Sequence, residues 1–336
     1  MKIPAIAFVV PCYNEEAILQ ETITQLLKKR MDLIRKKLIA PESRIVLVDD
    51  GSSDCTWEKI KQAVEKERKD ETVCGIRLSA NRGHQNALLA GLMYAKDHAD
   101  AAVSLDADLQ DDIDVLDDFM REYLHGNEIV YGVRNDRSAD RFFKRFSAVC
   151  YYRMLRWMGV RTIFNHADYR LMSRRALEIL SEYREVNLYL RGIVPLIGLR
   201  QSIVFYKRKP AVRPTRYPLS KMLLLAWDGI TSFSVRPIRI ISGLGVLFLF
   251  LSFLLLIRIL YVKFFGYTVD GWTSMLLAVT VFGGVQLLSL GVIGEYAAKI
   301  YMEVKQRPRF NVESILDPSD KKDSLSRESD SKECRK

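Results

Sequence analysis

Two long apolar runs near the C-terminal end constrain this chain most, because each is long enough to cross a bilayer as a helix. The first run covers residues 240–257 and the second covers residues 273–294, and neither contains Asp, Glu, Lys or Arg. A helix of about 20 residues spans the hydrocarbon core of a membrane. The sequence therefore predicts two transmembrane helices within 239–304, at about 239–262 and 272–297, joined as a hairpin.

Basic residues precede and follow the predicted hairpin. Between Arg200 and Arg239 the chain has nine Lys and Arg and a single acid, Asp228. Lys and Arg gather on the cytoplasmic side of membrane helices and are attracted to anionic lipid headgroups. We therefore expect residues 211–238 to form a basic juxtamembrane or interfacial segment and both termini to be cytoplasmic. This position favours lipid over nucleic acid as the partner of the basic segment.

Residues 1–210 alternate short β-rich runs with longer stretches of helical periodicity, which predicts one α/β domain with a Rossmann-like, mostly parallel sheet. The expected strands are Ile3–Val10, Arg44–Asp49, Gly75–Leu78, Ala101–Leu105, Glu128–Val133 and Ser202–Tyr206. The expected helices are Glu15–Leu38, Asp54–Lys69, Gln85–Asp97, Ile113–Leu124 and Asp140–Trp157. Segments 188–199 and 219–233 are expected at the membrane interface or packed on the sheet. Residues 317–336 lack apolar periodicity and are expected to be disordered.

Polar residues follow three of the predicted strands. Pro11-Cys12-Tyr13-Asn14-Glu15, Asp49-Asp50-Gly51-Ser52 and Asp106-Ala107-Asp108 all fall where a strand ends. Ligands of α/β domains bind at the carboxyl ends of their strands. The paired carboxylates of Asp106 and Asp108 suit Mg²⁺ or Mn²⁺ shared with substrate phosphates, and Gln110 is a further candidate ligand. The sequence thus indicates a metal and phosphate site at this edge.

Three other polar segments are less specific. Residues 81–84, Asn-Arg-Gly-His, open a predicted helix and suit either a phosphate site or a plain turn. A run of basic residues after the fifth predicted strand suits either an acceptor phosphate or a solvated surface. Asp168 could act as a base, orient an acceptor, or simply pair with Arg170. Neither Gly-x-Gly-x-x-Gly nor Gly-Lys-Ser/Thr occurs, which disfavours a dinucleotide oxidoreductase and a phosphate-loop enzyme.

Taken together, these segments resemble the family 2 glycosyltransferases, and within them the polyisoprenyl-phosphate glycosyltransferases. The resemblance extends from Ile3 to about Phe310. It is carried by residues 11–15, 48–52, 106–110, 168–171 and 294–296, and by Arg307-Pro308. One position departs, since Arg82 stands where the family commonly has an aromatic residue after Asn81.

The resemblance implies a GT-A fold and an inverting transfer of a sugar from a nucleotide-sugar, a UDP-sugar, to a polyprenyl phosphate such as undecaprenyl phosphate. It implies donor binding by Pro11, Tyr13, Asn14, Glu15, Asp49, Asp50 and Asn81. It assigns metal binding to Asp106 and Asp108, and the acceptor phosphate to Arg134 and Arg145. From the residues themselves, Gln110 is a further candidate metal ligand and Asp168 a candidate catalytic residue.

We therefore expect an enzyme of the bacterial cell membrane that acts in cell-envelope glycosylation. Its lipid-linked product would be passed to a flippase and to a second glycosyltransferase that uses lipid-linked sugars, and a homo-oligomer is compatible with the sequence.

Two alternative functions remain open at this point. A processive polysaccharide synthase shares the first motifs, although residues 156–157, Arg-Trp, lack the Gln expected three positions earlier. A membrane-interaction module without catalytic activity is the other.

Overall fold

The computed structural model describes residues 3–134, 166–186, 189–207, 236–265 and 271–318. They belong to two compact units. A sheet domain combines Met1–Ala148, Thr162–Arg216 and Pro308–Lys336, and a second unit combines Val149–Arg161 and Tyr217–Arg307. The expected helix over 140–157 and the expected interfacial segment over 219–233 lie outside the described residues.

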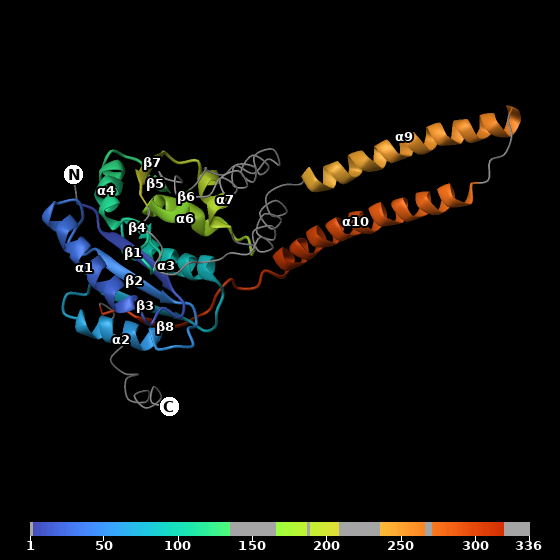
Figure 1. Ribbon diagram of the computed structural model, residues 1–336. Coiled ribbons are helices and arrows are strands. Elements are labelled where there is room, and N and C mark those ends of the chain that lie inside the picture. Colours follow the sequence, from blue (N-terminus) through green and yellow to red (C-terminus); the bar gives the residue numbers. More distant parts are fainter. Residues whose placement is uncertain (1–2, 135–165, 187–188, 208–235, 266–270, 319–336) are drawn as a thin grey trace. The chain divides into compact units, whose positions relative to one another are not determined.

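The sheet domain is built on an eight-stranded mixed sheet with the order β7-β5-β6-β4-β1-β2-β3-β8 (Figure 1). Strands β4, β1, β2 and β3 are parallel, and β5 and β7 are parallel to each other. β6 runs antiparallel between β4 and β5, and β8 runs antiparallel beside β3. The strands are β1 Ile6–Cys12, β2 Arg44–Asp49, β3 Val73–Leu78, β4 Ala101–Ser104, β5 Ile129–Arg134, β6 His166–Ser173, β7 Gln201–Tyr206 and β8 Val312–Leu316.

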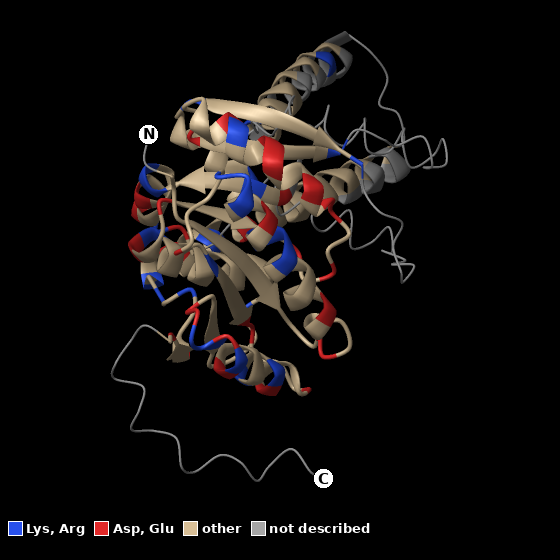
Figure 2. Cartoon of the chain, turned by 90° about the vertical axis from the view of Figure 1, so that its left-hand side faces the viewer, with Lys and Arg blue, Asp and Glu red and all other residues tan. Residues whose placement is uncertain are grey.

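Helices cover both faces of this sheet. On one face, apolar side chains of α1, α2 and α4 form the main core with alternate residues of β1 and β2. On the other face lies α3, which packs against β1, β2 and α6. The helices are α1 Leu19–Arg35, α2 Thr56–Lys66, α3 His84–His98, α4 Leu116–Leu124, α6 Arg174–Glu182 and the short α7 Leu190–Ile193. Figure 2 shows the strands largely free of charge, with acidic and basic residues gathered on helices and loops.

The contact between α3 and the sheet depends on Gly91. A Cβ atom at this position would lie 2.3 Å from Cγ1 of Val9 and 2.8 Å from Cγ2 of Val48. Both distances are too short for non-bonded carbon atoms, so only glycine lets the helix approach the two central strands this closely. The close approach sets the position of the first turn of α3, which belongs to the candidate site.

Two strands were not predicted from the sequence. β6 contains the Asp168 segment and runs beside β4, with Ser104 opposite Arg170. β8 follows the second apolar helix and covers the edge of β3. At its end Asp317, which the sequence analysis assigned to the tail, is buried against Nη1 of Arg44 at 3.2 Å and accepts a hydrogen bond from Tyr94. Strand β8 is therefore fastened to the sheet by polar as well as backbone contacts.

The second unit contains two long helices, α9 (Arg236–Phe265) and α10 (Trp272–Lys305). They contact each other, and the rings of Phe248 and Phe282 meet edge to face with centroids 5.5 Å apart. Within the described residues, one helical segment, Val281–Lys305, is long and apolar enough to cross a membrane, and Pro237–Phe248 is a shorter apolar helix. The predicted helix pair is present, while its two-span character is only partly supported.

Candidate active site

The three strand ends singled out in the sequence do meet at one edge of the sheet. Cys12 at the end of β1 lies opposite Asp49 at the end of β2, and the amide of Asp50 donates to the carbonyl oxygen of Cys12 at 2.9 Å. Strand β4 lies on the other side of β1 and ends at Ser104, just before the Asp106 loop. Parallel strands bring their carboxyl ends together in this way.

The loop after β1 is joined to the loop after β2 by hydrogen bonds. The amide of Asn14 donates to Oγ of Ser52 at 3.0 Å, and Oδ1 of Asn14 accepts from the amide of Ser53 at 2.9 Å. The amide of Glu15 donates to Oγ1 of Thr56 at 2.9 Å. Tyr13 is exposed beside these contacts. An exposed aromatic ring on a fixed loop is suited to stacking on a nucleotide base.

Pro11 is placed differently from the rest of this motif. It lies within β1 and is buried, with its backbone opposite Val48 of β2. Among the residues implied for donor binding, Pro11 therefore shapes the strand, whereas Tyr13 presents a side chain at the surface.

The two acids after β2 organise the neighbouring loops. The carboxylate of Asp50 accepts from the amides of Arg82 and Gly83 at 2.7 and 2.9 Å, which fixes the loop before α3. Asp49 accepts from the amide of Ser52 at 3.2 Å and lies 3.6 Å from Nε of Arg77. Burial raises the pKa of both carboxyl groups. These acids thus fix the loop after β2 and the loop before α3, between which the donor is expected to bind.

Directly after Asp50, the backbone turns sharply at Gly51. This residue has φ +66°, and a Cβ there would lie 2.7 Å from the carbonyl carbon of Ala80. Only glycine accepts both the left-handed conformation and the contact. Asn81, the next implied donor residue, is exposed, and its Oδ1 accepts from the amide of Gly83 at 3.1 Å.

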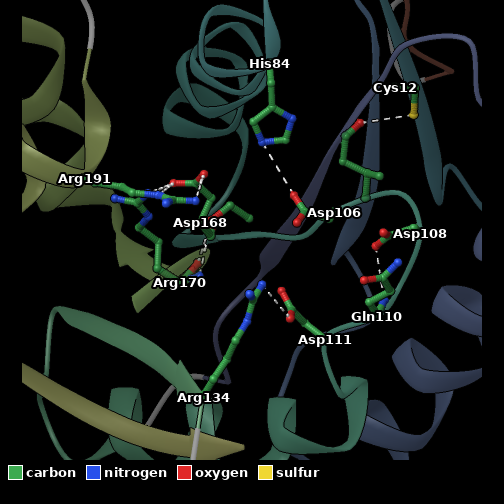
Figure 3. A network of polar contacts seen from close by, with 12 residues as sticks. Cys12, His84, Asp106, Asp108, Gln110, Asp111, Arg134, Asp168, Arg170 and Arg191 are labelled. Carbon is green, nitrogen blue, oxygen red and sulfur yellow. Dashed lines mark hydrogen bonds and ion pairs between the residues drawn. The ribbon is translucent and has the colours of Figure 1, made fainter. Parts of the chain in front are cut away.

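The acidic loop after β4 carries the metal candidates. Oγ1 of Thr22 donates to the carbonyl oxygen of Ala107 at 2.6 Å, and the carboxylate of Asp108 accepts from the amide of Gln110 at 3.2 Å. Asp106 is partly exposed, and Nε2 of His84 lies 3.5 Å from its Oδ1. Asp108 is more exposed and lies further along the loop, beside Gln110 (Figure 3). These two hydrogen bonds hold the loop, on which Asp106 is partly exposed and Asp108 is exposed.

Several acids surround Asp106 and concentrate negative charge there. Burial raises the pKa of Asp106, the neighbouring Asp111, Asp168 and Asp108 raise it further, and His84 lowers it. A divalent cation would relieve this repulsion, and carboxylate oxygens are the ligands that Mg²⁺ and Mn²⁺ take. Within the described residues no three His, Cys, Asp or Glu side chains converge as a complete metal site. An ion that is shared with substrate phosphates usually takes only one or two protein carboxylates, which Asp106 and Asp108 can supply.

Asp168 lies between two guanidinium groups (Figure 3). Its Oδ1 is 2.5 Å from Nη2 of Arg170, and its Oδ2 is 2.9 Å from Nη2 of Arg191. Burial alone would raise the pKa of Asp168, but Arg170 and Arg191 outweigh it and hold the pKa well below its usual range. A carboxylate so strongly stabilised in its charged form is a poor proton acceptor. The pairing with Arg170 weighed in the sequence is present, and Arg191 is its second partner.

Arg134 ends β5 at the same edge and points toward the acidic loop. Its Nη2 lies 3.3 Å from Oδ1 of Asp111, and its Nε donates to the hydroxyl oxygen of Tyr206 at 3.2 Å. Arg145, the other implied phosphate ligand, lies outside the described residues. The sheet edge thus brings Asp111 of the β4 loop to Arg134 of β5, and Asp168 of β6 to Arg191 of α7.

The sequence motifs give no role to His84 and do not single out Asp111 or Arg191. His84 was visible only as the last residue of a loop motif, and Asp111 only as the first acid after Gln110. Arg191 is 23 positions from Asp168, on an element whose place could not be inferred locally. The close spacing of Asp106, Asp108 and Asp111 was the available signal for Asp111.

Comparison with known proteins places this site in a family. Residues 7–180 match the family described as Glycosyl transferase family 2. The uncharacterized glycosyltransferase YkoT of Bacillus subtilis (strain 168) is 49% identical over 314 residues, which are 93% of this chain and 92% of the relative. The chain belongs to glycosyl transferase family 2.

Other matches cover nearly the whole glycosyltransferase. The SfII prophage-derived bactoprenol glucosyl transferase of Shigella flexneri is 36% identical over 308 residues, which are 91% of this chain and 96% of the relative. Among solved structures, a mannosyltransferase from Pyrobaculum calidifontis in complex with GDP-Man and Mn²⁺ aligns with 90% of this chain and 86% of its own, with a TM-score of 0.45 and 17% identity.

The observed fold and site agree with the family. The glycosyltransferase has the mixed α/β sheet expected of a GT-A fold, and the family match covers β1 to most of α6. An exposed tyrosine on the β1 loop, acids on the β4 loop and arginines on β5 and α7 surround one edge. One aromatic, several acidic and several cationic side chains therefore lie at the same edge of the sheet.

Proposed function

We propose that this glycosyltransferase transfers a sugar from a nucleotide-sugar, a UDP-sugar, to a polyprenyl phosphate, undecaprenyl phosphate, with inversion at the sugar carbon. The product is a lipid-phosphate-linked sugar for cell-envelope glycosylation. The observation that carries the proposal is the convergence of the Asp106 acids with Arg134 at one sheet edge, in a chain that also holds an apolar helix of membrane length. Relatives over most of its length are named bactoprenol glucosyl transferases.

The acceptor chemistry needs little help from a base. A phosphate monoester is largely ionised at neutral pH, so its oxygen is already a nucleophile. Arg134 is suited to bind it, since guanidinium groups hold phosphate oxygens in bidentate fashion. Asp168, locked between Arg170 and Arg191, then orients α7 and Arg191 at the acceptor side rather than removing a proton. The catalytic power in this proposal comes from alignment and charge stabilisation.

The donor is assigned to the space bounded by the β1 loop, the β2 loop and the start of α3. Tyr13 would stack on the base, and the loop fixed by Asp50 would face the diphosphate. A bound Mg²⁺ or Mn²⁺ would offset the charge of the leaving nucleoside diphosphate. Asp106 and Asp108 would hold that ion, with Gln110 beside them, because they are the partly exposed acids of the site.

The proposal includes a membrane topology that the chain path supports. The chain leaves the sheet domain before α9 and returns to the same sheet as β8 after α10. A chain that returns to the domain it left crosses a membrane an even number of times. Two crossings, with the sheet domain and both termini in the cytoplasm, match the basic flanks of the helices.

The test uses purified full-length protein in detergent with undecaprenyl phosphate and a panel of UDP-, GDP- and dTDP-sugars, and mass spectrometry detects lipid products. We expect a single sugar on the lipid phosphate, with activity abolished reversibly by EDTA. Asp108→Asn should reduce turnover at least about a hundredfold, because a metal-bound diphosphate loses one of its protein supports. A polymer of sugars on the product, or full activity without metal, would contradict the proposal.

A further inference from the structure

Tyr206 and Asp111 both contact the Arg134 guanidinium. Arg134 and Tyr206 are register partners on neighbouring strands β5 and β7, so their side chains lie on one face of the sheet. Nε of Arg134 donates to the Tyr206 oxygen at 3.2 Å, and Nη2 of Arg134 lies 3.3 Å from Asp111. Burial, and then the nearby Asp111 carboxylate, raise the pKa of the Tyr206 hydroxyl. Tyr206 and Asp111 thus each contact the Arg134 guanidinium.

The Tyr206 side chain is held in place by aromatic packing. The Tyr206 side chain is 3% exposed, and its ring meets that of Tyr169 edge to face with centroids 5.4 Å apart. Tyr169 also packs on Phe119 of α4, with centroids 4.7 Å apart, and its hydroxyl donates to the carbonyl oxygen of Asp112 at 3.1 Å. The aromatic rings therefore connect β6, β7 and α4 to the end of the acidic loop. Neither Tyr206 nor Asp111 can move far without disturbing this packing.

We propose that Tyr206 and Asp111 are positioning residues that fix the Arg134 guanidinium for the acceptor phosphate. The inference rests on the proposed function, because Arg134 is taken there as the phosphate ligand. An arginine side chain has several rotatable bonds, and holding its planar head group in place before the acceptor arrives removes that entropy cost from binding. The contact of Nε with Tyr206 and the contact of Nη2 with Asp111 together orient the plane of the Arg134 guanidinium.

A structural role alone would make a different prediction. If these residues only stabilised the fold, their removal would lower the melting temperature and the amount of active protein, with the Michaelis constants unchanged. If they position Arg134, the KM for the lipid phosphate should rise while the KM for the nucleotide-sugar stays the same. Slow hydrolysis of the donor by water, which needs the donor side only, should also stay the same.

The experiment compares Tyr206→Phe with Tyr123→Phe, in full-length protein with undecaprenyl phosphate. Tyr123 is a matched control, since its hydroxyl also donates one hydrogen bond, to the carbonyl oxygen of Asp100 at 3.2 Å, away from the active edge. We expect the Tyr206 variant to raise the KM for lipid phosphate about tenfold, since one hydrogen bond to a charged group is lost. The Tyr123 variant should leave that KM unchanged.

Asp111→Asn extends the test to the second contact. It should raise the KM for lipid phosphate and leave donor hydrolysis and the metal concentration for half-maximal activity unchanged. A shift in the metal requirement instead would place Asp111 in the metal site and overturn its assignment. Equal lipid KM values in wild type and the Tyr206 and Asp111 variants would overturn the inference while wild-type transfer still supported the proposed function. Absence of lipid product from wild type would overturn both.

Discussion

The contact that fastens β8 to the sheet can be tested by Asp317→Asn. Asp317 is 7% exposed and lies 3.2 and 3.3 Å from Nη1 of Arg44, which is itself 18% exposed. Removing one partner of a buried ion pair costs about 3–5 kcal/mol, because the other charge remains in a poorly solvated place. Glu71 lies 3.8 Å from Arg44 and can compensate in part. We therefore expect a loss of about 2 kcal/mol of unfolding free energy.

The assay is unfolding of the purified protein in detergent, followed by circular dichroism. A loss of about 2 kcal/mol should lower the melting midpoint by roughly 4–8 °C for a domain of this size. Glu71→Gln is the control, because Glu71 is about half exposed and its pair with Arg44 is worth at most about 0.5 kcal/mol. Hydrogen exchange should accelerate in β8 of the Asp317 variant and not in the control. Identical midpoints for the two variants would refute the reasoning.

Three further outcomes are expected. Gly91→Ala should destabilise the domain by about 2 kcal/mol, seen as a lower melting midpoint, since its Cβ would meet Val9. Asp168→Asn should cost about 3 kcal/mol in urea unfolding at pH 7, because Arg170 is fully buried. That difference should shrink below about pH 4: the lowered pKa of Asp168 stabilises the native state above the unfolded pKa, and this contribution is lost as the pH falls. A tag after Lys336 should resist protease added outside intact cells, and external cleavage would contradict the cytoplasmic topology.

Most of the sheet domain could be predicted from local sequence. Strand β2 was predicted with its observed bounds, because Arg44–Asp49 is an apolar run that ends at two acids and a glycine. Strand β6 escaped because its eight residues mix charged and apolar types without alternation, and its position depends on pairing with β4 and β5. Strand β8 is only five residues long and follows a helix of membrane length. Both strands pair antiparallel with distant segments, which no local pattern encodes.

The site shows the same division. Asp106 and Asp108 could be found because they follow a buried strand directly. Arg191 as a partner of Asp168, and Tyr206 as a partner of Arg134, could not be predicted, because both lie on separate elements. Side chains brought together from positions 23 and 72 residues apart leave no periodic signal in the sequence.

The return of β8 to the sheet has a consequence for how the enzyme is made. The two long helices are an insertion within the sheet domain, because the last strand is encoded after them. During synthesis β3 must therefore keep an open edge until the inserted helices have left the ribosome, and unpaired strand edges invite wrong pairing. Completion of the sheet domain thus depends on prior synthesis of the two inserted helices. A truncation before α9 would remove the final strand and the Asp317 contact along with both long helices.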